Sequence, residues 1–179
     1  MPLHHLGGIV SVEDRHAKGG GVTSLMTKPI TLKARTAPRM TRAELESFLT
    51  KEFPQAFHAG SGLSLESVAY GECRVRLAYR DRYIRPGGTM SGPTMMMLAD
   101  FALYVAILSA IGPVALAVTT NFNINFLRRP EPKDILADAR IMKLGKRLAV
   151  MEVTLYSDGS DEPIAHVTST YSIPPIPAA

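Results

Sequence analysis

The sequence contains a single cysteine, Cys73, among its 179 residues. One thiol excludes an intramolecular disulfide and a zinc site built from cysteines. Cys73 falls in a strand-like segment, so we expect a packed thiol rather than a nucleophile. No Gly-rich phosphate-binding motif precedes a helical segment, and no internal repeat is visible. The sequence therefore carries no motif that assigns a nucleotide or a repeat architecture.

Signals for export and for metal binding are also missing. The first twenty residues lack an apolar stretch of the length that a secretory signal peptide needs, so a cytoplasmic protein is the default expectation. His4 and His5 are adjacent, but no third ligand follows at a useful spacing. We therefore expect no metal site.

The positive charge is confined to one end of the chain. The formal net charge is +4, and residues 1–39 hold six Lys or Arg against two acids, whereas residues 40–179 hold 14 of each. We expect residues 1–39 to be a disordered basic extension, parts of which are not native if Met26 or Met40 is the true start. Residues 40–174 form the expected domain and residues 175–179 a frayed tail. The domain itself gives no indication of a nucleic-acid or membrane partner, although a regulatory dimer with a nucleic-acid-binding tail is a minor alternative.

The longest apolar run, residues 91–111, organises the rest of the chain. Ser91 suits a helix N-cap, a proline follows in the first turn, and Gly112 ends the run. The segment is apolar on nearly every face, which predicts a helix buried on all sides. Its length would also span a membrane, but Asp100 lies in the middle and no basic flank follows, so we favour a buried helix.

Asp100 is the one charged residue in this run. A lone buried carboxylate is costly unless it is paired, hydrogen-bonded or protonated. A buried carboxylate is also a stronger general base, which makes Asp100 a candidate catalytic residue. The alternative is a helix-interior acid bonded to a Ser, a Thr or the backbone.

Other segments alternate between strand and turn patterns. Thr41 and Glu44 form a capping box that opens a short amphipathic helix ending before Pro54. Six further segments read as strands: 63–70, 72–79, 115–127, 135–144, 147–156 and 164–173. We expect consecutive antiparallel hairpins on either side of the long helix, in a curved sheet that wraps it. The expected class is α+β.

Residues 121–126 alternate strictly between asparagine and apolar side chains. Phe122, Ile124 and Phe126 share one face of the predicted strand, and Asn121 lies with two further asparagines on the other. The polar face meets water, a ligand or a partner, and the sequence leaves these alternatives open.

Three stretches together resemble one family: GGTMSGPTMMMLADFALY, NFNINFLRRP and MKLGKRLAVMEVTLY. They resemble the hotdog-fold acyl-CoA thioesterases of the phenylacetic-acid-degradation (PaaI-like) type, over roughly residues 41–171. The resemblance implies an antiparallel β-sheet wrapped around one long central helix. It also implies hydrolysis of an acyl-CoA to free acid and coenzyme A, no cofactor beyond the coenzyme A of the substrate, and a homodimer or homotetramer.

The same resemblance implies roles for individual residues. In the family the helix opens with His-Gly-Gly, and an acid follows nine residues after the His; here Gly92 and Asp100 match the first Gly and the acid. Gly92 then donates its N–H to the oxyanion, and Asp100 is general base or nucleophile. Thr119 matches a residue that orients water. Ser91 replaces the family His and Arg85 replaces an assisting Asn. Arg85 either offers a cation to the thioester oxygen or pairs with Asp100.

The resemblance also suggests where the substrate is held. Regions equivalent to several basic strand ends and turns meet the phosphates of coenzyme A in the family, and plain surface charge is the alternative for each residue. The candidate substrate-binding residues are Asn121, Arg128, Arg129, Lys143, Lys146, Arg147 and Met96, the last as part of a methionine-rich acyl pocket or of ordinary core packing.

The spacing of Gly92 and Asp100 limits how they act together. Eight residues along one helix separate them by about 12 Å, too far for both to contact one carbonyl group. If both act, the Asp100 of a site comes from a neighbouring subunit whose helix runs antiparallel, as in a two-fold dimer. The competing hypothesis is a non-catalytic acyl-CoA or lipid-binding protein of the same fold, favoured by the replaced His and Asn.

Overall fold

The computed structural model describes residues 36–175, which lie in one compact unit. The predictions for the basic extension up to residue 35, for the adjacent histidines and for residues 176–179 lie outside the described residues.

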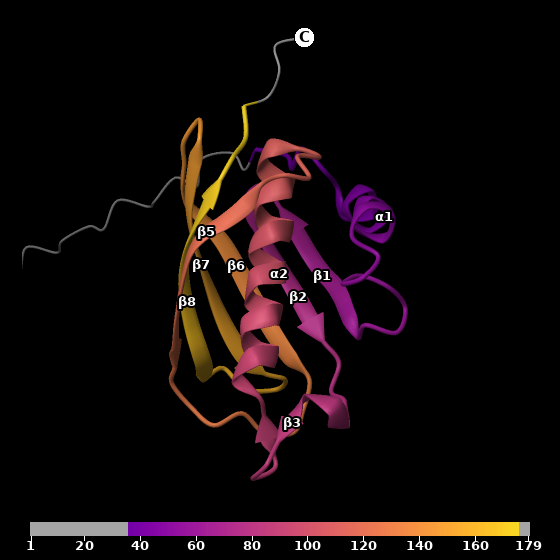
Figure 1. The fold of residues 1–179 in the computed structure, drawn as a ribbon, viewed down its shortest axis with the longest axis vertical. Helices are drawn as coiled ribbons and strands as arrows, with labels where there is room; N and C mark the ends of the chain where they lie inside the picture. Colours follow the sequence, from indigo (N-terminus) through magenta and orange to yellow (C-terminus); the bar gives the residue numbers. More distant parts are fainter. Residues whose placement is uncertain (1–35, 176–179) are drawn as a thin grey trace, which may run out of the picture. The chain divides into compact units, whose positions relative to one another are not determined.

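The described chain forms a six-stranded antiparallel sheet that packs against one long helix, α2 (Figure 1). The strands follow one another across the sheet in the order β1-β2-β6-β7-β8-β5. Their bounds are β1 Leu63–Ala69, β2 Glu72–Leu77, β5 Val118–Phe126, β6 Ile135–Leu144, β7 Leu148–Ser157 and β8 Pro163–Ser172. The helices are α1 Arg42–Glu52 and α2 Gly92–Ile111, and between β2 and α2 lie the short helix η1 Asp81–Tyr83 and the hairpin β3 Ile84–Arg85 with β4 Thr89–Met90.

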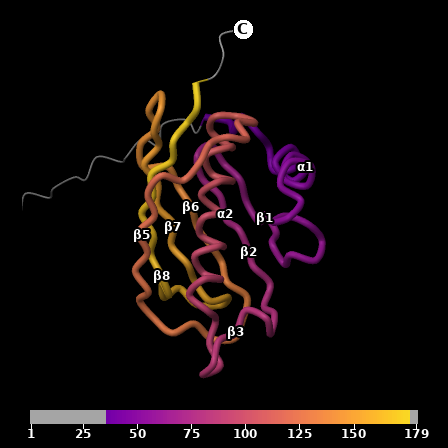
Figure 2. The backbone as a smooth tube through the Cα atoms, viewed as in Figure 1, coloured from indigo at the N-terminus to yellow at the C-terminus, as the bar shows by residue number. Residues whose placement is uncertain are grey.

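This arrangement confirms the predicted class and most element bounds, and corrects one pairing. The sequence predicted consecutive hairpins, which would place β5 beside β6. Instead β5 crosses to the far edge of the sheet and pairs with β8, while β6 pairs with β2 (Figure 2). Helix α2 lies between β2 and β5 in the chain and packs across the sheet, so β5 enters at the edge far from β2. The edge of β2 is then left for β6.

Local signals start both helices as predicted. The Thr41 hydroxyl accepts the Glu44 N–H at 3.4 Å, and the Glu44 carboxylate accepts the Thr41 N–H at 2.7 Å. The Ser91 hydroxyl accepts the Thr94 N–H at 3.3 Å at the start of α2. Helix α2 ends at Ile111, and Gly112 follows as its C-cap with a φ of 91°, a value that residues other than glycine rarely adopt.

The inner face of the sheet carries small residues where α2 crosses it. Helix α2 contacts β2, β6 and β7. Ala137 and Ala139 of β6 and Ala149 of β7 are buried under the helix, together with larger residues such as Val153. Small side chains at these positions let the helix lie close to the sheet.

Cys73 belongs to this core, as predicted. Its side chain is 5% exposed, and its thiol donates to the Ala102 carbonyl at 3.2 Å. Burial raises the pKa of the Cys73 thiol, so the reactive thiolate is disfavoured.

One face of α2 is exposed, which contradicts the prediction of a helix buried on all sides. Pro93, Met96, Met97 and Asp100 are exposed or partly exposed, and Tyr104 is half-buried. Their spacing of three or four residues places them in one stripe along the helix, named here the open stripe. Within residues 36–175, α2 is the one helix long and apolar enough to cross a membrane, but 72% of the tested window is buried, as in the core helix of a folded domain.

Candidate functional site

Asp100 projects from the open stripe and is held by two hydroxyl groups. The Thr119 hydroxyl donates to Asp100 Oδ1 at 2.6 Å. The Tyr171 hydroxyl donates to the same oxygen at 3.1 Å and lies 3.2 Å from the Asp100 main-chain carbonyl oxygen. The expected burial of Asp100 is wrong for the single chain. The bond from Thr119 is of the kind named in the alternative interpretation, an acid bonded to a Ser, a Thr or the backbone.

Strand pairing brings the two hydroxyls together. Thr119 of β5 and Tyr171 of β8 lie directly opposite each other on the face of the sheet that meets α2. A register shift between Thr119 and Asn121 leaves Thr120 without a paired residue. This bulge keeps Thr119 and Phe122 on the inner face although they are three residues apart, and it directs Thr119 toward the helix.

A mostly apolar cleft of about 480 Å³ opens beside Asp100. We name it the Asp100 cleft; its walls include Phe53, Met97, Phe101, Tyr104 and Val118, with Glu52 also lining it. The Phe53 and Tyr104 rings meet edge to face, with centroids 6.2 Å apart. A carboxylate and two hydroxyls are thus placed beside a surface suited to an apolar group.

A second groove, of about 600 Å³, lies at the start of α2. This Gly92 groove is lined by Arg85, Gly92, Phe126, Arg128 and Arg129, among others. A Cβ atom added at Gly92 would lie 3.3 Å from the Phe126 ring, so the glycine leaves room between ring and helix.

The first turn of α2 leaves one N–H group without an acceptor. Pro93 has no N–H, and the N–H groups of Thr94 and Met95 are accepted by the side chain and the carbonyl of Ser91. The Ser91 hydroxyl also bonds the Thr94 hydroxyl at 2.8 Å, so it serves the helix end. Within the described chain, no acceptor reaches the Gly92 N–H, which is therefore available to a ligand.

The structure separates the predicted site residues into two sets. Ser91, Gly92 and Arg85 lie at the start of α2, and Gly92 and Arg85 line one groove. Asp100 and Thr119 line the other cleft. Among the described residues, Arg85 forms no ion pair with Asp100 and lines the groove away from it, so the predicted alternative of such a pair is not realised within one chain.

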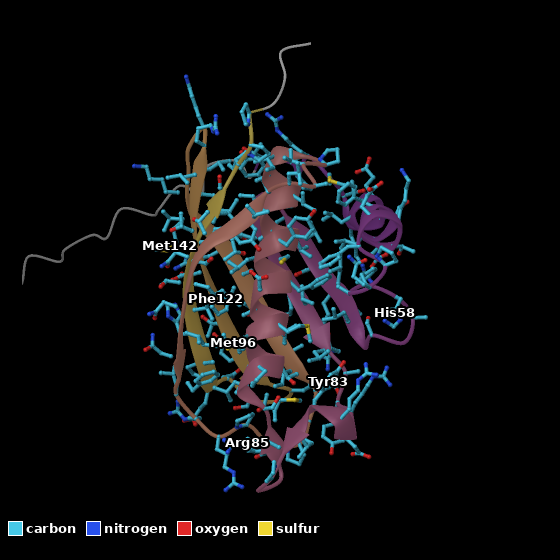
Figure 3. The ribbon with its side chains drawn as sticks, viewed as in Figure 1. His58, Tyr83, Arg85, Met96, Phe122 and Met142 are labelled. Atoms are coloured by element: carbon cyan, nitrogen blue, oxygen red, sulfur yellow. The ribbon has the colours of Figure 1, made fainter. Side chains whose placement is uncertain are left out.

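The basic residues also fall into two groups, of which one lines the Gly92 groove and the other lines neither hollow. Arg128 and Arg129 precede β6 and line the Gly92 groove. The other three follow β6 or end it, at its turn into β7: Lys143, Lys146 and Arg147. A ten-residue strand spans about 30 Å, so the two groups lie at opposite ends of the sheet. Figure 3 labels Arg85 at the lower end of the view and Met142, close to the β6–β7 turn in sequence, well above it.

Two further candidates lie outside both hollows. Asn121 pairs with Thr170 on the face of the sheet directed away from α2. Met96 is exposed on the open stripe, and Met97 rather than Met96 lines the Asp100 cleft. Met90 and Met95 are buried beside the Gly92 groove. Within residues 36–175, no three His, Cys, Asp or Glu side chains gather as a metal site.

Tyr171 is the site residue that the sequence did not reveal. It lies in a strand predicted only by its alternation, 71 residues from Asp100. An inward-facing tyrosine in an apolar strand must place its hydroxyl against a polar partner, and that is the available signal. The partner of this hydroxyl could not be predicted, because it depends on the pairing of β5 with β8 at the edge of the sheet.

Known proteins share this fold and these sequence features. Residues 87–164 match the model of the thioesterase superfamily. The crystal structure of a candidate thioesterase from Silicibacter sp. TM1040 is 43% identical, covers 77% of this chain and 94% of its own, and superposes with a TM-score of 0.70. The chain belongs to the hotdog thioesterase superfamily.

Other thioesterase-fold relatives are more distant. The phenylacetic acid degradation protein PaaI from Thermus thermophilus, solved as a mutant, is 27% identical, with 63% of this chain and 94% of that chain covered and a TM-score of 0.57. A candidate esterase from Halobacterium salinarum is 33% identical over 52% of this chain, and the match spans 65% of its length. Membership of the superfamily and the names of these relatives support thioester hydrolysis as the reaction class.

Proposed function

We propose that the protein hydrolyses an acyl-CoA thioester to the free acid and coenzyme A, at sites shared between two subunits. The observation that carries the proposal is the division of the site. A hydroxyl-bonded carboxylate, Asp100, lies beside an apolar cleft, while the free N–H of Gly92 lies about 12 Å along the same helix in a groove with basic residues.

The Gly92 N–H suits the oxyanion that forms during thioester hydrolysis. It lies at a helix N-terminus, where the helix dipole favours negative charge. When a nucleophile adds to the thioester carbon, the carbonyl oxygen becomes an oxyanion, and a fixed N–H donor lowers the energy of this state. Arg85 lines the same groove and supplies a positive charge nearby.

Asp100 supplies the other half of the reaction by one of two routes. As general base, it takes a proton from water, and the resulting hydroxide adds to the carbonyl carbon. As nucleophile, its oxygen forms an anhydride with the acyl group, which water then hydrolyses. In both routes the C–S bond breaks and coenzyme A leaves as the thiolate, which takes up the proton released by the attacking water. The products are therefore the acid and the thiol.

Two antiparallel copies of α2 bring these halves together. In an antiparallel pair of helices, the residue numbers that face each other have a constant sum. If Gly92 of one subunit faces Asp100 of the other, that sum is 192. Met96 then faces the partner's Met96, so the two-fold axis passes beside this residue. Met96 and Met97 are 41% and 39% exposed on the open stripe, which gives the pairing an apolar centre. In this assembly Met96 therefore belongs to the subunit interface rather than to the acyl pocket.

The basic residues fit the same assembly. Antiparallel helices place the Gly92 end of one subunit toward the opposite end of its partner. Arg128 and Arg129 of one subunit, with the Lys143, Lys146 and Arg147 of a second copy, are then available to the phosphates of coenzyme A.

The reaction is tested with the purified protein and a panel of acyl-CoAs that vary in length, branching and aromatic content. We expect release of free thiol, followed with a thiol reagent, and the highest kcat/KM for an acyl group that fills the 480 Å³ Asp100 cleft. Tight binding without thiol release across the whole panel would replace this proposal with the non-catalytic acyl-CoA-binding alternative.

The assembly is tested with a Met96→Cys variant. We expect most of this variant to form a disulfide-linked dimer under mild oxidation, because in the proposed pairing a residue beside the two-fold axis faces its own copy, where a short disulfide can join the two chains. Ala59→Cys, in the exposed loop after α1, is the matched control and should stay uncrosslinked. Equal crosslinking of the two variants on non-reducing gels would contradict the pairing centred on residue 96. The native Cys73 is buried and does not interfere.

A further inference from the structure

The two hydroxyl groups at Asp100 converge on one carboxylate oxygen. Both donate to Oδ1, from Thr119 at 2.6 Å and from Tyr171 at 3.1 Å. Within the described chain, no donor reaches Oδ2. Because the side chain lies on an exposed helix face, several rotamers would be open to it without these bonds. The two donors select one of them.

Tyr171 is fixed more firmly than Thr119. Its side chain is 2% exposed, whereas Thr119 lies on the edge strand β5. Its hydroxyl also lies 3.2 Å from the main-chain carbonyl oxygen of Asp100, so its position is tied to the helix backbone as well as to the carboxylate. Burial and the nearby Asp100 carboxylate raise the pKa of the Tyr171 hydroxyl, which therefore remains a proton donor at neutral pH.

We propose that Tyr171 is a positioning residue that, with Thr119, holds Oδ1 of Asp100 and thereby presents Oδ2 to the substrate. The inference rests on the proposed function and adds a residue to it. Tyr171 does not contact the reacting atoms; it acts through the carboxylate. Loss of its hydroxyl removes one of the two bonds that hold Oδ1, so the carboxylate is less ordered.

The test compares Tyr171→Phe with a matched loss of a tyrosine hydroxyl elsewhere. The Tyr79 hydroxyl donates to Asp81 Oδ1 at 3.0 Å on the exposed surface, so Tyr79→Phe removes the same kind of bond away from the cleft. We expect Tyr171→Phe to lower kcat about tenfold with KM changed less than about twofold, because a hydrogen bond to a charged group is lost. Tyr79→Phe should retain the wild-type kcat.

The split between kcat and KM separates positioning from a general structural effect. A distorted cleft would raise KM as well as lower kcat, whereas a less ordered Asp100 carboxylate lowers kcat alone, because the apolar walls of the cleft are unchanged. If Tyr171→Phe does not fold, Thr119→Val removes the other donor to Oδ1 and should lower kcat with KM kept. A wild-type kcat in that variant would overturn the inference.

An activity-independent measurement keeps this inference distinct from the proposed function. Carbon-13 NMR of the Asp100 side chain at neutral pH should show one ordered rotamer in the wild type and averaging over several rotamers in Tyr171→Phe. If no acyl-CoA is hydrolysed by the wild type, the proposed function fails, yet the rotamer measurement still decides whether Tyr171 holds the carboxylate. Identical rotamer populations and identical kcat values in wild type and Tyr171→Phe would overturn the inference.

Discussion

Replacement of Asp100 by Asn is expected to lower kcat by about two to three orders of magnitude, the effect typical of a lost general base or nucleophile. Asn keeps the size of the side chain and an oxygen that accepts from Thr119 and Tyr171. It removes the charge and the second basic oxygen. KM should change little, because the apolar walls of the Asp100 cleft remain.

The fold should tolerate this change because Asp100 lies on the open stripe of α2. The unfolding midpoint of Asp100→Asn should therefore stay within a few degrees of the wild type, which circular dichroism would measure. Asp81→Asn is the matched control, since Asp81 is exposed and also accepts a tyrosine hydroxyl. A kcat of Asp100→Asn within a few-fold of that of Asp81→Asn would remove Asp100 from the mechanism.

Much of the fold follows from signals that act within a few residues. The capping box at Thr41 and the N-cap at Ser91 were predicted because each forms between residues three positions apart. Strand β6 was predicted with its observed bounds, since alternation of side chains marks a strand with one buried face. These local patterns do not depend on which strands become neighbours.

The errors concern features that depend on distant parts of the chain. The pairing of β5 with β8 was missed because several strand orders satisfy the same alternation pattern. The exposure of Asp100 was missed because an apolar helix face can be covered by a sheet or by a second subunit, and composition does not distinguish the two. Tyr171 was missed because its contact with Asp100 requires the β5–β8 pairing.

The candidate site was predicted in part, and mainly through the resemblance. The resemblance selected Gly92 and Thr119, whereas Asp100 was already a candidate as the one charge in the apolar run. The structure places Thr119 on Asp100. The distance between Gly92 and Asp100 was predicted from helix geometry alone, and the two residues indeed line different hollows. From the sequence, the basic residues were predicted to form one phosphate-binding set. In the structure, Arg128 and Arg129 lie before β6, and the other three lie at its far end.

A complementation experiment tests whether one site takes residues from two subunits. We expect both Asp100→Asn and Gly92→Val to be nearly inactive as homodimers. In Gly92→Val the new side chain enters the groove beside the free N–H, while the exposed Phe126 ring can shift to admit it. In a heterodimer of the two variants, one site combines the intact Gly92 of one subunit with the intact Asp100 of the other. The second site carries both defects.

Heterodimers isolated by two different affinity tags should therefore regain about half of the wild-type kcat per dimer, since one of two equivalent sites is restored. This is a gain of at least about tenfold over either parent variant, given the loss expected for Asp100→Asn. Heterodimers of Asp100→Asn with a subunit carrying both substitutions contain no intact pair and should stay inactive. If the first heterodimer is as inactive as this control, Gly92 and Asp100 do not serve one site across the interface, and the antiparallel arrangement of α2 is wrong.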